Sequence, residues 1–353
     1  METPLLNEHR AAHAQLGEYH GCLLPEKFSD LDTEYRAAKE TAAIFDTNWH
    51  AIFSLSGPDR VRYLNAVVSN DIKSVGESYG TRALLLNPQG HILAELEVYA
   101  LADKLLVRTH ASVRERTFAT LDKYIIMDDV TLEDLTDQLA SFAVEGPQAG
   151  TVVAQACGLA LEGFSEFATA QLPIDGVPCH LIRRSHFGGI GAEIIAPREH
   201  LGLLWQSMHA RVHAARGASI GMATLNALRL ETGIPWFPDD FNDTVIPHEA
   251  RLEATHVSFT KGCYTGQEIV ERVRSRGHVN RRRVSLKFSS VGPPAPSTRL
   301  RAKGGEGAEV GLVTSSAFSP KTGTAIGMAY VRGEHHAAGS ILEFDGGTAT
   351  VTS

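Results

Sequence analysis

The sequence predicts an α+β protein in which a mixed body of helices and strands is followed by a small, all-β C-terminal module. Helical and strand patterns alternate up to about residue 283, after which helical periodicity ends and short, glycine-punctuated apolar runs begin at Val284. The 353 residues exceed what one hydrophobic core usually fills. We therefore expect three parts: residues 1–140, with strands and helices over 34–130; residues 141–283; and residues 284–353.

The first part carries both helix and strand signals. Ser56-Gly57-Pro58 precedes apolar residues spaced by three and four over 61–68, which predicts a short helix. The turn sequence at 87–90 is followed by strict alternation over 92–99, which predicts a half-buried strand. A second strand is expected at 105–108, and helical spacing returns over 118–125.

The second part contains the clearest helices. Apolar residues recur with a 3.6-residue period from Leu201 to Val212, and another helix is expected from about Met222 until Gly233 ends it. In the third part, apolar runs such as 310–313 and 326–331 alternate with turn residues, which is typical of a small β-barrel or sandwich.

Composition excludes several classes of protein. Hydrophobic residues make up 43% and charged residues 21%, which is the usage of a folded globular chain rather than a disordered one. The net charge of −8 argues against duplex DNA as a general partner. The sequence shows neither an apolar run of membrane-spanning length nor a secretory signal, and its four scattered cysteines fit a reducing compartment, so we expect a cytoplasmic protein.

The segment 259–268 holds the sharpest chemical feature of the sequence. Cys263 lies between Gly262 and Tyr264-Thr265-Gly266, two residues from Lys261, whose cation would favour a thiolate. This makes Cys263 a candidate reactive or ligating thiol; the alternative is a small buried hydrophobe in a turn. One cysteine cannot complete a four-donor zinc or cluster site, so no metal centre is predicted.

Arginines gather directly after this segment, first Arg272, Arg274 and Arg276 and then Arg281, Arg282 and Arg283, with His278 between the two groups. If the chain is extended there, Arg272, Arg274 and Arg276 point to one face and form a stripe able to clamp carboxylates or phosphates. The alternative is a solvated strand whose arginines pair with acids. Binding of RNA stays open, although no aromatic residues are interleaved with the arginines for base stacking.

Three further residues suggest recognition of a planar heterocycle. Glu193 follows a glycine-rich turn, and Arg229 and Glu231 lie at the end of the second predicted helix. A carboxylate can accept two N–H bonds from an amide-like edge. Surface ion pairs would explain the same residues equally well.

The motif 261–268, Lys-Gly-Cys-Tyr-Thr-Gly-Gln-Glu, with the stretches at 87–90, 144–151 and 228–233, resembles the YgfZ-type folate-binding proteins, which help maintain iron–sulfur enzymes. Those proteins are relatives of the glycine cleavage T-protein, an aminomethyltransferase. The resemblance implies a three-lobed fold with tetrahydrofolate in a central channel. It implies that Glu193 meets the pterin, that Arg229 lines the folate pocket and that Cys263 faces the channel, with Glu231, Tyr264 and Gln267 as further candidate cofactor-binding residues.

One position departs from the T-protein pattern. Those relatives carry adjacent aspartates, one of which acts in aminomethyl transfer, where this sequence has Ala94-Glu95. The main hypothesis is therefore a tetrahydrofolate-binding accessory protein for iron–sulfur cluster assembly or repair, partnered by assembly proteins or client enzymes such as tRNA-modifying ones, with Cys263 and Lys261 as its reactive pair. The alternative is a tetrahydrofolate-dependent aminomethyl- or methyltransferase acting on a small amine, with Glu95 as the remaining acid. A third possibility is a binding module that uses the arginine stripe on RNA or polyglutamylated folate.

Overall fold

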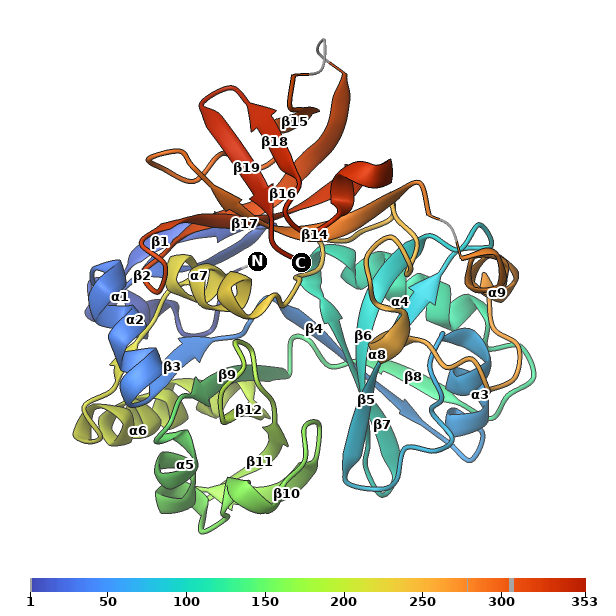
Figure 1. Cartoon of the computed structure of the whole chain (residues 1–353). Helices are drawn as coiled ribbons and strands as arrows, with labels where there is room; N and C mark the ends of the chain where they lie inside the picture. The colour runs from blue at the N-terminus through green and yellow to red at the C-terminus, as the bar shows by residue number, and fades with distance from the viewer. Residues whose placement is uncertain (1, 278, 305–307) are drawn as a thin grey trace. The chain divides into compact units, whose positions relative to one another are not determined.

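The computed structural model, drawn in Figure 1, describes residues 2–277, 279–304 and 308–353. Its chain divides into two compact units. The first unit comprises Met1–Asn65, Ile72–Arg82 and Leu96–Leu225, and the second comprises Ala66–Asp71, Ala83–Glu95 and Asn226–Ser353. The three parts proposed from the sequence stay a prediction.

A six-stranded sheet forms one half of the first unit, and helices α5 (Ala149–Cys157) and α6 (Leu201–Ala214) pack on it (Figure 1). In spatial order its strands are β10 (Thr169–Ile174), β11 (Val177–Arg183), β12 (Gly191–Pro197), β9 (Leu139–Glu145), β3 (Ala43–Asp46) and β13 (Ala218–Ser219). The predicted apolar stripe of α6 is buried throughout: Leu201, Leu204, Trp205, Met208 and Val212. This stripe fixes the helix on the sheet because its burial removes a continuous apolar surface from water.

A five-stranded sheet has the order β5 (Tyr79–Leu86), β6 (Ile92–Ala100), β7 (Lys104–His110), β4 (His50–Ser56) and β8 (Thr131–Asp134). Within the first unit, apolar residues of both sheets, including Tyr99, Leu106 and Ile195, join in one buried cluster. The remaining elements of the N-terminal half are α1 (Leu6–Ala11), the hairpin β1 (Gln15–Tyr19) and β2 (Cys22–Lys27), α2 (Leu31–Glu40), α3 (Arg60–Val67) and α4 (Arg114–Lys123).

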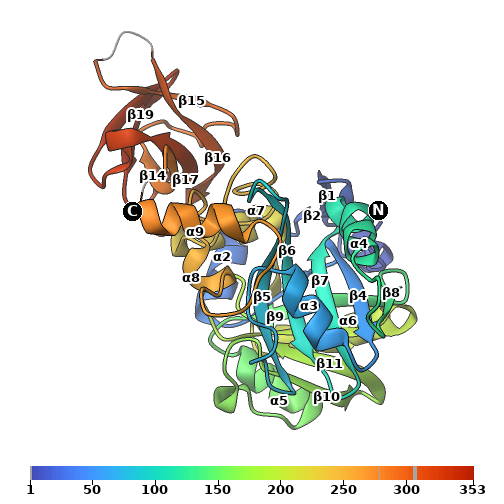
Figure 2. The ribbon, with the colours of Figure 1, turned by 90° about the vertical axis from the view of Figure 1, so that its right-hand side faces the viewer.

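The second unit contains a closed barrel, which confirms the all-β C-terminal module (Figure 2). Its strands, in order around the barrel, are β14 (Arg281–Phe288), β17 (Thr324–Arg332), β16 (Glu309–Ser319), β15 (Arg299–Ala302), β18 (Ile341–Phe344) and β19 (Gly347–Val351). Inward-facing residues such as Leu286, Ala329 and Leu342 form its core. Helices α7 (Met222–Thr232), α8 (Glu253–His256) and α9 (Gln267–Arg276) precede the barrel, and α7 ends before Gly233 as predicted.

The prediction of a half-buried strand at 92–99 is wrong for its second half. Ile92, Ala94 and Leu96 are buried as expected, but Glu97 and Tyr99 on the opposite face are buried as well. The alternating pattern hides this because Glu97 on the second face is covered by charged side chains, described below, while Tyr99 on the same face joins the apolar cluster shared by the two sheets.

The prediction of an arginine stripe on a strand is also wrong. Arg272 and Arg274 lie on helix α9, where successive i, i+2 residues point to different sides. Arg272 Nη2 lies 2.8 Å from Glu268 Oε1, one helical turn away, and Arg274 Nη1 lies 3.6 Å from Glu271 Oε2. Pairing with acids is confirmed for Arg272 and Arg274, but the solvated strand in that alternative is wrong as well. His278 lies outside the described residues.

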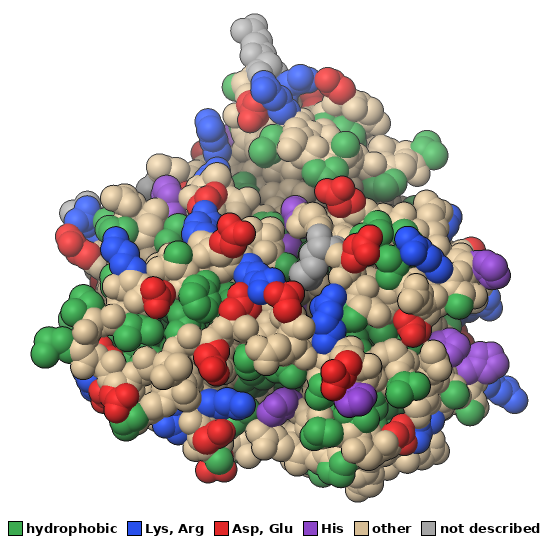
Figure 3. Space-filling view, turned by 180° about the vertical axis from the view of Figure 1, so that it is seen from behind, with side chains coloured by type: hydrophobic (Ala, Val, Ile, Leu, Met, Phe, Trp, Pro, Cys, Tyr) green, Lys and Arg blue, Asp and Glu red, His purple; other side chains and the backbone are tan. Residues whose placement is uncertain are grey.

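Acidic and basic side chains are interspersed on the face drawn in Figure 3. Of the helices that the structure describes, none has both the length and the apolar character needed to cross a membrane.

Candidate functional site

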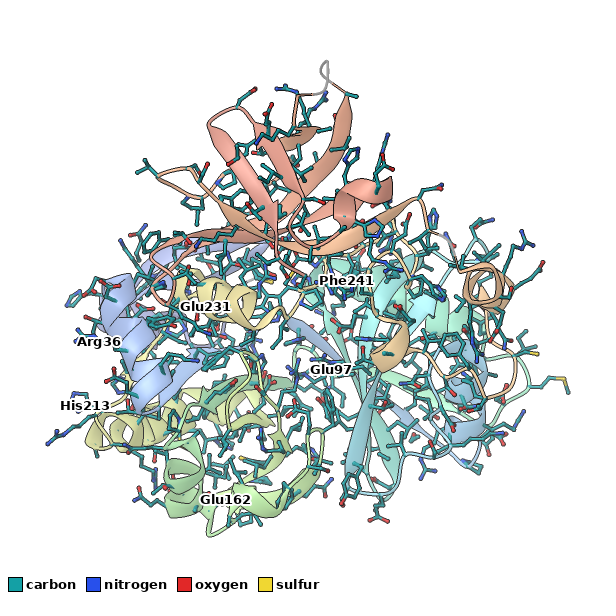
Figure 4. All side chains as sticks on the ribbon, viewed as in Figure 1. Arg36, Glu97, Glu162, His213, Glu231 and Phe241 are labelled. Carbon is teal, nitrogen blue, oxygen red and sulfur yellow. The ribbon has the colours of Figure 1, made fainter. Side chains whose placement is uncertain are left out.

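A buried ionic cluster in the first unit contains Glu193, the carboxylate predicted to meet a heterocycle. Arg108 on β7 donates from Nη1 to Glu193 Oε2 at 2.8 Å, and its Nη2 donates to Glu193 Oε1. Arg108 also donates to Glu97 Oε2 at 3.3 Å, which lies directly opposite it in the β6–β7 register (Figure 4 labels Glu97). Arg108 and Glu193 have no exposed surface, so the pair is held entirely by protein groups.

More polar groups close the cluster. Arg184 Nε donates to Glu97 Oε1 at 2.8 Å, and the Tyr99 hydroxyl donates to Glu97 Oε2 at 2.9 Å. Arg108 Nη2 also donates to His50 Nδ1 at 2.7 Å, and His186 Nε2 lies 3.3 Å from Glu193 Oε2. A guanidinium cannot accept a hydrogen bond, so His50 Nδ1 is the acceptor from Arg108 and cannot also donate to the Thr47 carbonyl oxygen, which lies 3.0 Å away.

The electrostatics keep both acids ionised. Burial alone would raise the pKa of Glu193, but Arg108 and His186 hold it well below its usual range. Burial would also raise the pKa of Glu97, but the nearby Arg184 and Arg108 guanidinium groups lower it below its usual range. Burial, reinforced by Arg108, lowers the pKa of His50 to about 4, so this imidazole is neutral at pH 7.

Glu145, at the end of β9, holds the loop that carries His186. Its carboxylate accepts from the Ser185 hydroxyl at 2.8 Å and from the backbone N–H groups of His186 at 2.6 Å and Gly189 at 2.8 Å. Glu145 is fully buried. It therefore positions the loop, because a buried carboxylate with several N–H donors defines one backbone conformation.

A second constellation lies in the second unit, around Ala94 and Glu95 on β6. Ala94 is buried and has no functional group, whereas the Glu95 carboxylate lies 2.9 Å from His256 Nε2. The His256 side chain is 2% exposed and that of Glu95 is 23% exposed. The other ring nitrogen, Nδ1, lies 2.7 Å from the hydroxyl of Thr255, an exposed residue.

Ser69 fixes the position of His256. Its hydroxyl donates to the His256 carbonyl oxygen at 2.6 Å and accepts from the backbone N–H of Leu84 on β5 at 2.8 Å. The N–H of Ser258 donates to the Ser69 carbonyl at 3.0 Å. The end of the short helix α8 is therefore attached to Ser69 at His256 and again at Ser258, and the imidazole is held beside Glu95 on β6.

The cysteine loop also belongs to the second unit. Cys263 is an exposed free thiol, which contradicts the alternative of a buried hydrophobe. Lys261 donates from Nζ to the Val68 carbonyl oxygen and lies 4.9 Å from the centre of the buried Tyr264 ring. Burial, with Glu271 nearby, raises the pKa of Tyr264 to about 12.

Gly266 lets this loop pack closely against the turn at 87–90. Gly266 has φ +81°, and a side chain there would bring Cβ to 2.6 Å from the Asn87 carbonyl oxygen. Only glycine permits both this conformation and this approach. Gln267, a candidate cofactor contact, is the first residue of α9 and is half-buried.

Arg229 and Glu231, on α7, make structural contacts rather than pairing with each other. Arg229 is buried, donates from Nη1 to Asp240 and lies 4.5 Å from the centre of the Trp236 ring. Asp240 also accepts from the hydroxyls of Thr314 and Ser315, each at 2.5 Å, so the pair joins α7 to the barrel. Glu231, labelled in Figure 4, accepts from the Ser319 hydroxyl.

Sequence reasoning missed Arg108 and Asp240, and it considered His256 only as a metal ligand and not as the partner of Glu95. Arg108 interrupts an apolar run and Asp240 lies in an acidic pair, but neither pattern identifies a partner. The described part of the chain contains no group of three or more His, Cys, Asp or Glu side chains able to hold a metal ion.

Comparisons with known proteins agree over nearly the whole chain. The family model "GCVT N-terminal domain" matches residues 5–261, and the "Glycine cleavage T-protein C-terminal barrel domain" matches residues 281–352. An aminomethyltransferase of Chlorobaculum parvum is 29% identical over 331 residues, which cover 93% of this chain and 89% of the relative. An aminomethyltransferase of Desulforamulus reducens is 27% identical over 330 residues, with the same coverage of 93% and 89%.

The glycine cleavage system aminomethyltransferase T from Bartonella henselae has the same fold, with a TM-score of 0.90 and 23% identity over 100% of this chain and 97% of that one. The predicted T-protein-like fold is thereby confirmed. The YgfZ branch within this superfamily is not distinguished by these matches. With both of its domain models matched in order, the chain belongs to the glycine cleavage T-protein family.

Proposed function

We propose that this protein is a tetrahydrofolate-dependent one-carbon transferase that moves an aminomethyl or methyl group from a small amine. The observation that carries the proposal is the Glu95 carboxylate, held 2.9 Å from a buried imidazole at the strand position of the family's acids. Aspartate and glutamate differ by one methylene, and His256 offsets the longer reach by fixing where the carboxylate lies. The names of the relatives support the transferase class.

The residues around Glu193 fit a pterin in their chemistry. Each carboxylate oxygen can accept two hydrogen bonds, and a pterin edge presents adjacent N–H donors much as a guanidinium does. Arg108 Nε is buried and has no hydrogen-bond partner among the described residues, so the cluster also retains a donor. Glu193 is the residue that would hold the pterin, and binding requires Arg108 to give up part of its contact with that carboxylate.

Bound tetrahydrofolate would supply the nitrogen that accepts the carbon unit. The chain's own contribution is a base: Glu95 removes a proton from a nitrogen nucleophile at one carboxylate oxygen while His256 holds the other. The family resemblance also implies cofactor contacts from Arg229, Glu231, Tyr264 and Gln267, which stay a proposal. Buried Arg229 would act mainly by supporting α7.

The test is product formation by the purified chain with tetrahydrofolate. A dithiol aminomethylated by formaldehyde and ammonia should yield methylenetetrahydrofolate, and methylamines should yield methyltetrahydrofolate at unchanged oxidation level. Formaldehyde also reacts without enzyme, so the rate is compared with Glu95→Gln, which keeps size but cannot take up a proton. Equal rates for wild type, Glu95→Gln and buffer with every donor would refute the transferase.

The exposed Cys263 thiol supports a second candidate, the folate-binding accessory role in iron–sulfur cluster maintenance. In cells lacking the protein, this role predicts that wild type restores the activity of a cluster-containing tRNA-modifying enzyme and that Cys263→Ala does not. Full restoration by Cys263→Ala would remove the thiol from the mechanism. Glu95→Gln separates the candidates, because only the transferase requires that carboxylate.

A further inference from the structure

The contacts around Glu95 continue through His256 to the surface of the second unit. His256 uses both ring nitrogens, Nε2 toward Glu95 Oε1 at 2.9 Å and Nδ1 toward Thr255 Oγ1 at 2.7 Å. Both distances are those of ordinary hydrogen bonds. The imidazole between them is 2% exposed, whereas Thr255 at the far end is an exposed residue.

We propose that Glu95, His256 and Thr255 form a proton relay between the carboxylate and solvent, an inference that rests on the proposed function. An imidazole bonded through both nitrogens can take a proton at one and release another at the other. A hydroxyl both donates and accepts, so Thr255 can pass that proton outward. Glutamine in place of histidine could hold Glu95 but could not perform this exchange.

The relay can carry both the proton that is released and the proton that is taken up when a carbon unit moves from one heteroatom to another. Each new C–N bond releases one N–H proton, and each broken bond to the leaving group takes one up; no oxidant or reductant is consumed. At rest Nε2–H donates to the Glu95 carboxylate and Nδ1 accepts from the Thr255 hydroxyl. The Nε2 proton passes to Oε1 for the leaving amine while Nδ1 takes the Thr255 hydroxyl proton, which solvent replaces. A proton that Glu95 then takes from the nucleophile returns by the reverse passage and restores the original tautomer.

The arrangement gives the proton an exit that a bound ligand does not block. A substrate over Glu95 would displace water from the reacting side of the carboxylate. The His256 side is closed already, since the imidazole side chain is 2% exposed. The hydrogen-bonded chain is the route that stays continuous when the open side is covered.

The first test does not depend on activity. In protein labelled with ¹⁵N-histidine, exchange of the His256 ring proton with water is measured by NMR in wild type, Thr255→Val and Thr255→Ser. The relay predicts at least tenfold slower exchange in Thr255→Val and near-normal exchange in Thr255→Ser, which keeps the hydroxyl. Equal exchange in wild type and Thr255→Val overturns the relay.

The second test uses the transfer reaction. His256→Gln should lower kcat with little change in KM, and added imidazole should restore part of the loss by carrying the proton. Imidazole should not rescue Glu95→Gln, which lacks the base. Turnover of His256→Gln at the wild-type rate overturns the relay while leaving the transferase intact; absence of wild-type turnover refutes the transferase, and the exchange measurement still decides the relay.

Discussion

Replacing Arg108 by methionine tests the buried ionic cluster most directly. The substitution keeps an unbranched side chain of similar reach but leaves Glu193 and Glu97, both buried, without their shared cation. Removing one partner of a buried pair costs about 3–5 kcal/mol, since the remaining charge stays desolvated. At roughly 2–4 °C per kcal/mol for a unit of this size, we expect the Tm to fall by about 6–20 °C at pH 7.

The pH dependence identifies the cause of this loss. In the wild type the pKa of Glu193 lies below its unfolded value, so its stabilising contribution is present above about pH 4.3 and is lost as pH falls through the lower folded value. In Arg108→Met, burial is no longer opposed by the guanidinium, and the pKa of Glu193 rises above the unfolded value. The carboxyl can then protonate, so the Tm difference between variant and wild type should shrink from pH 8 to pH 5.

Thermal unfolding followed by circular dichroism measures both effects. Arg114→Met is the matched control, because Arg114 pairs with Asp134 and Asp137 at a partly exposed position, where loss of a pair costs about 1 kcal/mol or less. A Tm difference for Arg108→Met that equals the control, or that is independent of pH, would show that the cluster is not a desolvated ionic network.

Three further substitutions test the other contacts. Asp240→Asn should lower the free energy of unfolding in urea by about 3–5 kcal/mol, because it leaves buried Arg229 without its carboxylate. The control Asp175→Asn, in a surface ion pair, should cost about 1 kcal/mol or less. Equal losses would contradict the structural role of Asp240. Glu145→Gln should cost about 1–3 kcal/mol and accelerate amide exchange in the 185–189 loop, since an amide group cannot accept all of the bonds; unchanged exchange would count against the loop-positioning role. Cys263→Ser should leave the Tm unchanged and remove the fastest phase of thiol labelling by a disulfide reagent, because this cysteine is exposed; persistence of that phase would assign it to another thiol.

Local patterns predicted the elements whose burial is one-sided. The stripe of α6 and the stop of α7 at Gly233 follow from sequence spacing because one apolar face or one special backbone conformation decides each. The barrel was predictable from short apolar runs between turns. Arg272 and Arg274 were wrongly assigned to a strand because arginines at every second position resemble the alternation of a strand. The apolar residues Ile269, Val270 and Val273 have helical spacing instead and favour helix α9.

By itself, the sequence determined the α+β class, the C-terminal barrel and the membership of the T-protein superfamily. Tertiary structure alone decided which charges are partners. Arg108 meets Glu193 across 85 positions and His256 meets Glu95 across 161, separations over which residue type carries no information about contact. Burial then strengthens these contacts, because charges and hydrogen bonds act more strongly where water is removed from around them.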